Sequence, residues 1–169
     1  MSIIKNIITA VSALSICAAA NANWDLHDRT DPFTDEVKVV GANMAPIEGK
    51  GVLGFSCNNK KLSVNVMTAG YLNNGDFGDV TFRFDKEKPV TEKWFAHGSM
   101  AMSENSALFG MIKDGGHETV VIRATSYDHD SYTARFSLDG AAEVAQAVAE
   151  ACEAQGEIGR LKDMVDSAN

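Results

Sequence analysis

Residues 132–152, YTARFSLDGAAEVAQAVAEAC, contain the change of apolar period that decides the fold. Up to residue 138 apolar side chains alternate with polar ones, which is the pattern of a β-strand with one face on a core. From Ala141 onward the apolar residues recur at helical spacing and form a stripe that ends at Cys152. Asp139 stands where a helix N-cap is expected. This stretch therefore predicts a strand followed directly by a helix.

The same two-residue alternation continues through the sequence upstream. It is clearest over residues 62–66 and 80–85. Between the segments stand Asn, Asp and Gly residues, which are typical of turns. Residues 103–113 fit a helical turn less clearly. Four more segments are predicted as strands: 36–40, 52–57, 90–96 and 119–125. We therefore expect a mainly β (α+β) fold, an antiparallel sheet or sandwich of about seven to eight strands with a C-terminal helix.

Two cysteines lie on predicted core faces. Cys57 shares the apolar face of its strand with Leu53 and Phe55, and Cys152 lies on the apolar stripe of the helix. A metal pair would need further ligands and a catalytic thiol would need a base, and neither has a candidate in the sequence. We therefore expect a Cys57–Cys152 disulfide that ties the helix to the sheet. Such a long closed loop stabilises the fold by about 4 kcal/mol in the chain-entropy model.

Residues 1–22 have the order of a secretory signal peptide. Lys5 gives the start a positive charge, an apolar run follows, and Ala20-Asn21-Ala22 offers the small residues that a signal peptidase reads. The apolar run is shorter than the ~20 residues that cross a bilayer. A lipoprotein anchored through Cys17 is the alternative, which Ile16 disfavours because a small residue precedes a lipidated Cys. The sequence therefore predicts export to the periplasm.

The exported part is expected to be one acidic domain. Residues 23–152 form the predicted β-rich domain, and residues 153–169 form a polar, glycine-broken C-terminal tail. Loss of Lys5 with the leader leaves 14 basic and 23 acidic residues, a net charge of −9. Such a charge repels nucleic acid and anionic lipid head groups, and no later segment is apolar enough for membrane insertion. The expected partner is therefore another envelope or secreted protein.

The sequence offers no constellation typical of catalysis or metal binding. Ser56 lacks the second glycine of a nucleophile elbow, and residues 73–79 lack the alternating oxygen ligands of a calcium loop. The histidines stand singly, without the spacing of zinc ligands: His27, His97, His117 and His129. We therefore expect no catalytic site, no metal and no cofactor.

Three arginines are candidates for a partner-binding surface. Arg83, Arg123 and Arg135 all fall on the outward phase of their predicted strands. If these strands are neighbours in the sheet, the guanidinium groups form a positive stripe on an acidic protein. Arginine is enriched at recognition surfaces because its planar fork binds carboxylates and stacks on rings. The alternative is that each arginine pairs with a carboxylate on a neighbouring strand of a solvated face.

Short motifs are spread over nearly all of the predicted mature chain: Trp24, 31–35 (DPFTD), 55–57 (FSC), 62–64 (LSV), 80–85 (VTFRFD), Trp94, 125–127 (TSY), 134–140 (ARFSLDG) and Cys152. Together they resemble the VasI/TagO family of type VI secretion-associated periplasmic proteins. The chain departs from the family pattern at Phe33, where Met is usual, and in the 17 residues that follow Cys152. The resemblance implies an accessory or binding role in the envelope and brings no active-site residues with it.

Three classes of function remain at this point. The first is an exported periplasmic interaction or accessory protein without catalytic activity, associated with type VI secretion. The second is a small inhibitor or immunity protein that blocks a toxin or a cell-wall enzyme. The third, an envelope enzyme, is expected least because no catalytic constellation supports it.

We predict that the exported protein begins at or near Asn23. The intact mass of periplasmic material should show loss of residues 1–22 and no added lipid, because Ala20-Asn21-Ala22 presents the cleavage site. A diacylated mass that starts at Cys17 would contradict this prediction.

Overall fold

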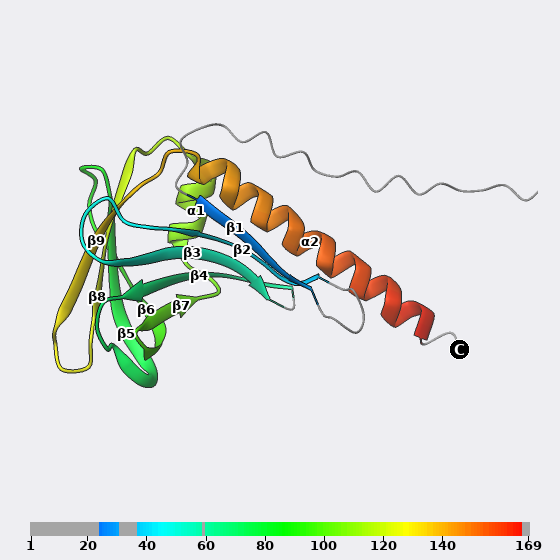
Figure 1. Ribbon diagram of the computed structural model, residues 1–169, viewed down its shortest axis with the longest axis horizontal. Coiled ribbons are helices and arrows are strands. Elements are labelled where there is room, and N and C mark those ends of the chain that lie inside the picture. The colour runs from blue at the N-terminus through cyan, green and yellow to red at the C-terminus, as the bar shows by residue number, and fades with distance from the viewer. Residues whose placement is uncertain (1–23, 31–36, 59, 167–169) are drawn as a thin grey trace, which may run out of the picture.

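The computed structural model describes residues 24–30, 37–58 and 60–166, and the predicted leader over residues 1–22 lies outside them. Nine strands in these residues form one antiparallel sheet in the order β1-β2-β3-β4-β7-β6-β5-β8-β9 (Figure 1). The elements are β1 Trp24–Thr30, β2 Val37–Met44, β3 Gly51–Asn58, β4 Lys61–Thr68, β5 Asn73–Phe84, β6 Val90–Gly98, β7 Met100–Ser103, α1 Ala107–Asp114, β8 Thr119–Thr125, β9 Ser131–Ser137 and α2 Ala141–Asp166.

The mainly β class and the C-terminal helix are confirmed, but the strand count of about seven to eight was too low. The two additional strands are β1 and β7. β1 carries polar residues over most of its length, and β7 has only four residues, of which three in succession are apolar. Neither strand therefore shows a two-residue apolar period. β7 forms because the two residues Gly98 and Ser99 close a hairpin in which His97 pairs with Met100.

The sheet is curled, and both helices cover the same face of it, which we call the inner face. α2 runs along the half formed by β1–β4 in Figure 1, where it contacts β2, β3 and β4, and α1 contacts α2. Most residues predicted to alternate inward are buried, but Leu62 is only partly buried and Ser63, predicted to face outward, is buried. The largest fully buried side chains of the inner face are Trp94, Phe55, Phe82, Phe84, Phe136, Leu53 and Ile122. The opposite, outer face carries no helix in the described part of the chain.

The two helices begin in different ways. The Ser106 hydroxyl accepts a hydrogen bond from the Leu108 amide at 3.1 Å and caps α1. Glu92 supports the same end, because it accepts bonds from the Ala107 amide at 2.9 Å and from the Trp94 indole at 2.7 Å. In α2 the first helical bond runs from the Val144 amide to the Gly140 carbonyl. Gly140, not the predicted Asp139, is therefore the N-cap.

α2 continues past Cys152 to Asp166, so most of the stretch 153–169 that we expected as a polar, glycine-broken tail belongs to the helix. Gly156 and Gly159 each cost roughly 1 kcal/mol relative to Ala in a helix interior. Extending an existing helix requires no new nucleation, however, and the residues around these glycines are mostly good helix formers. None of the helices in the described residues combines the length and apolarity needed to cross a bilayer.

The predicted disulfide is confirmed. Cys57 of β3 and Cys152 of α2 are bonded across 95 residues of sequence, with their Cα atoms 5.4 Å apart. Both side chains are buried, Cys57 completely. The bond fixes α2 over the half of the sheet that contains β2, β3 and β4.

A turn carboxylate connects two further strands. Asp85, which follows β5 at a φ of 42°, accepts hydrogen bonds from the Thr119 amide at 2.9 Å and the Glu118 amide at 3.4 Å. Its carboxylate also lies 3.5 Å from the His117 imidazole. The Thr119 amide is the main reason why the pKa of Asp85 lies below its ordinary value of 3.8. The ionised carboxylate thereby holds the start of β8 beside the end of β5.

We predict that removing the disulfide weakens the fold without dissolving the sheet. Cys57→Ala combined with Cys152→Ala should lower the free energy of unfolding by roughly 2–4 kcal/mol, because the unfolded chain regains the freedom of the closed loop. Urea titrations followed by circular dichroism would measure the change, with reduced wild-type protein as the matched control. Equal unfolding midpoints for oxidised and reduced wild type would contradict the prediction.

We also predict a pH-dependent role for Asp85. A carboxylate whose pKa is lowered by folding stabilises the folded state above its ordinary pKa, and this contribution is lost as the pH falls through the folded-state pKa. Asp85→Asn should therefore be less stable than wild type at neutral pH, and the difference in the free energy of unfolding should shrink as the pH falls below the ordinary Asp pKa of 3.8. Urea midpoints across this range test it. If the stability difference between wild type and Asp85→Asn stays constant with pH, the charge of the Asp85 carboxylate does not contribute to stability.

Candidate partner-binding face of the sheet

The structure brings the three predicted arginines together on the outer face. They lie on β5, β8 and β9, which are consecutive in the sheet. Val121 of β8 pairs with Arg83 on one side and with Arg135 on the other. Arg123 lies two residues further along β8 and therefore points to the same side as Val121. The strand adjacency on which the predicted stripe depended is thus present.

The partners of the three guanidinium groups differ. Arg135 Nε forms an ion pair with Glu48 Oε2 at 3.1 Å, and the two residues are also joined through their backbones. Arg123 Nε donates to the Thr133 hydroxyl at 3.3 Å. Among the described residues, Arg83 has no hydrogen-bond or ion-pair partner. Within the described part of the chain, the alternative of a carboxylate partner for each arginine therefore applies only to Arg135, whose partner Glu48 comes from the segment before β3.

Two shallow hollows flank Val121 on this surface. One, of about 270 Å³, lies between Arg83 and Arg123 and reaches Pro89. The other, of about 280 Å³, lies on the Arg135 side and is bounded by Glu48 and Thr133. Val121 and at least one arginine line each hollow. Such a surface can receive a carboxylate together with a small apolar group.

The outer face continues from the arginines into an exposed aromatic pair. Phe77 of β5 and Phe95 of β6 are cross-strand partners in T-shaped contact, with ring centroids 6.1 Å apart. Phe77 is 62% exposed and Phe95 is 40% exposed. Between this pair and the arginines, Lys93 and Asp79 form an ion pair at 2.8 Å. The aromatic pair and the arginine stripe thus lie on one side of β5, about 20 Å apart along the strand.

The sequence analysis did not identify the aromatic pair, although a signal for it exists. Phe77 differs from the buried Phe82 by an odd number of positions, and Phe95 directly follows the buried Trp94. In a regular strand both relations place the phenylalanines on the face opposite the core.

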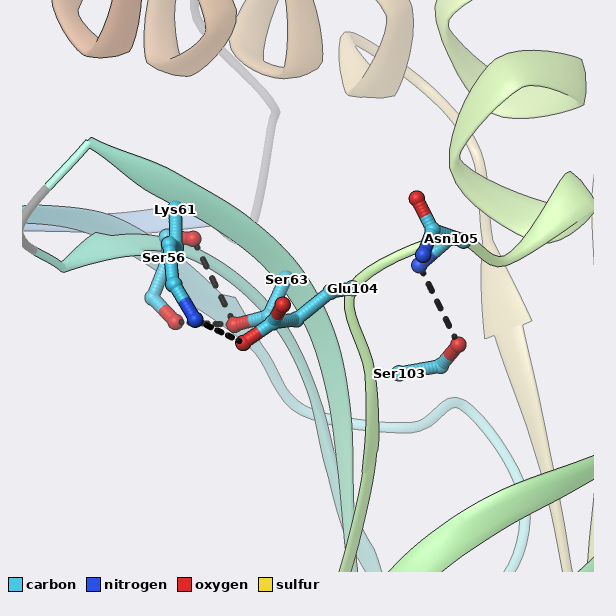
Figure 2. Close-up of polar contacts among 6 residues, drawn as sticks. All are labelled: Ser56, Lys61, Ser63, Ser103, Glu104 and Asn105. Atoms are coloured by element: carbon cyan, nitrogen blue, oxygen red, sulfur yellow. Dashed lines mark hydrogen bonds and ion pairs between the residues drawn. The ribbon is translucent and has the colours of Figure 1, made fainter. Parts of the chain in front are cut away.

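The described residues contain no arrangement typical of nucleophilic catalysis. The Ser56 hydroxyl lies 3.0 Å from the Ser63 hydroxyl (Figure 2). Asn65 also donates to the Ser56 hydroxyl at 3.4 Å, so neither of these partners is a base that could activate it. Figure 2 also shows the ion pair between Lys61 and Glu104, which joins β4 to the segment after β7. These contacts are structural links between neighbouring strands.

The four histidines lie apart from one another, so they form no common site. Two are on strands and two are in turns: His27 on β1, His97 on β6, His117 before β8 and His129 between β8 and β9. The turn that contains His129 is held by a hydrogen bond from Ser126 to Asp128, and this bond lowers the pKa of the Asp128 carboxyl. Among the described residues, no group of three or more His, Cys, Asp or Glu side chains converges to hold a metal ion.

Several residues that carry the family resemblance have structural roles. Trp24 stacks on Phe55 with ring centroids 5.0 Å apart, Trp94 is fully buried, and Cys152 is in the disulfide. The motif at residues 31–35 lies outside the described residues. No protein-family model, curated protein or solved structure matches this chain.

Proposed function

We propose that this protein is an exported periplasmic interaction protein that binds an acidic region of an envelope or secreted protein through the outer face of its sheet. The observation that carries the proposal is the arginine stripe of β5, β8 and β9, in which Arg83 and Arg123 have no carboxylate partner among the described residues. Cations left unpaired on a protein of such negative charge favour a partner that supplies carboxylates.

The charges around the stripe support this proposal. Two carboxylates of this surface are already occupied, Asp79 by Lys93 and Glu48 by Arg135. They therefore do not neutralise Arg83 or Arg123. A bidentate bond from a guanidinium to a carboxylate is among the stronger polar contacts, and it fixes the orientation of the bound group.

The aromatic pair supports recognition of a protein. Interfaces combine aromatic residues at an apolar centre with arginine and a polar rim, and the exposed rings of Phe77 and Phe95 are suited to such a centre. The span of about 20 Å from Phe77 to Arg83 fits within one side of an interface of standard size. Both parts belong to a rigid sheet, so little ordering entropy is lost on binding.

Because of the resemblance to the VasI/TagO family, we propose that this binding activity serves an accessory role in type VI secretion. An inhibitor or immunity protein would present the same kind of surface to a toxin or a cell-wall enzyme. The identity of the bound protein separates the two roles: a component of the secretion apparatus supports the first, and a toxin or hydrolase supports the second.

We predict that a photo-crosslinking residue placed at Thr81, between the arginines and the aromatic pair, captures a defined envelope protein in vivo. The same residue placed at Gln146, on the exposed side of α2, should not capture it. With that protein purified, Arg83→Ala and Arg123→Ala should each weaken binding at least about fivefold, and salt should weaken wild-type binding, because the contacts are charged.

Lys113→Ala is the matched control, because it removes an exposed cation from α1, away from the outer face. All three variants should melt close to wild type, since exposed charges contribute little to stability. If Arg83→Ala and Arg123→Ala bind as tightly as Lys113→Ala does, the outer face is not the binding surface.

A further inference from the structure

Three methionines and a histidine occupy neighbouring positions on the outer face, at a distance from the arginines. Met100 of β7 pairs in register with His97 of β6 on one side and with Met67 of β4 on the other. Directly paired residues share a face, so these three side chains stand in one row across three strands. Met102 lies two residues further along β7 and points to the same side. We call these four residues the thioether cluster.

The members of the cluster are accessible. Met67 is 45% exposed, His97 is exposed, and Met100 and Met102 are half-buried. Among the described residues, none of the four side chains has a hydrogen-bond or ion-pair partner. The His97 ring lies near Gly75 of β5, where an added Cβ would be 3.9 Å from Nδ1. An exposed imidazole can turn from there toward Met100, because rotamer changes of exposed side chains are fast.

The register fixes how closely these donors can approach one another. Cross-strand partners have Cβ atoms about 5 Å apart, and residues two positions apart on a strand are separated by about 7 Å. Methionine has three rotatable side-chain bonds, so its sulfur can move over several ångströms. Three thioethers and one imidazole can therefore converge on one ion above β7.

The donor types select the kind of ion. Thioether sulfur is a soft ligand that prefers Cu(I) over hard cations, and imidazole is compatible with copper. The cluster contains no carboxylate for calcium or magnesium and no thiolate for zinc, and Cys57 and Cys152 are joined in the disulfide.

We propose that the thioether cluster of Met67, Met100, Met102 and His97 is a binding site for a soft monovalent metal ion, Cu(I), with Ag(I) as its redox-inert analogue. The site is separate from the arginine stripe and does not depend on the proposed function. It departs from the expectation of no metal, which considered zinc and calcium patterns but not methionine sulfur. The bound ion would lie beside Phe95, which pairs with Met102.

The test is an anaerobic competition between the purified protein and the chromophoric Cu(I) complex of bicinchoninate, under reductant that leaves the disulfide intact. Wild type should withdraw one equivalent of Cu(I). Met67→Leu, Met100→Leu and Met102→Leu should each weaken binding about tenfold or more, because each removes one sulfur ligand. Leucine keeps the size and apolarity of methionine, so these variants should fold normally.

Met111→Leu is the control, since Met111 lies on α1 against the core and outside the cluster. It should bind Cu(I) as wild type does. In parallel, Ag(I) added to protein with labelled methionine methyl groups should shift the NMR signals of Met67, Met100 and Met102 and leave that of Met111 in place. Failure of wild type to compete for Cu(I), or equal binding by the three cluster variants and Met111→Leu, would overturn the proposal. In the latter case the methionines serve only as apolar surface.

Discussion

Burial of one apolar face of a single curled sheet is the constraint on which the rest of this structure depends. Phe55, Phe82, Phe84 and Phe136 are fully buried on that face, and each contributes about 1.5–3 kcal/mol relative to an exposed side chain. A sheet alone leaves such a face in water, so it must be covered. α1 and α2 provide the cover, and the Cys57–Cys152 bond fixes α2 in place.

The same constraint determines what the outer face can do. Because both helices lie on the inner side, the outer side chains of the described strands are free to serve recognition. Three features share this face: the arginine stripe, the pair of Phe77 and Phe95, and the thioether cluster. The strand register holds them at fixed separations, since slipping a strand by one residue would reverse which side chains face the core. The inner face thus stabilises the fold, and the proposed binding sites belong to the outer face of the same sheet.

Local sequence patterns predicted most of the strands and the C-terminal helix, but not the order in which the strands pair in the sheet. Period-two alternation located β5 and β9, and core-facing positions identified Cys57 and Cys152 as a pair. The polar β1, the four-residue β7 and the extension of α2 to Asp166 had no such pattern, because pairing and helix propagation produced them. The strand order could not be predicted from the sequence either. β7 lies between β4 and β6, and this order brings Met67 beside Met100. The alternation predicted that the three arginines point outward from their strands. That these strands are neighbours in the sheet could be seen only in the three-dimensional structure.

Hydroxyl-radical footprinting of the free protein tests the two-sided sheet most directly, because phenylalanine occurs on both faces. We expect rapid modification of Phe77 and Phe95, which are 62% and 40% exposed, and protection of Phe82, Phe84 and Phe136, which are at most 1% exposed. Similar modification rates for the two groups, or faster modification of the second, would contradict the assignment of inner and outer faces, and with it the proposed binding surface.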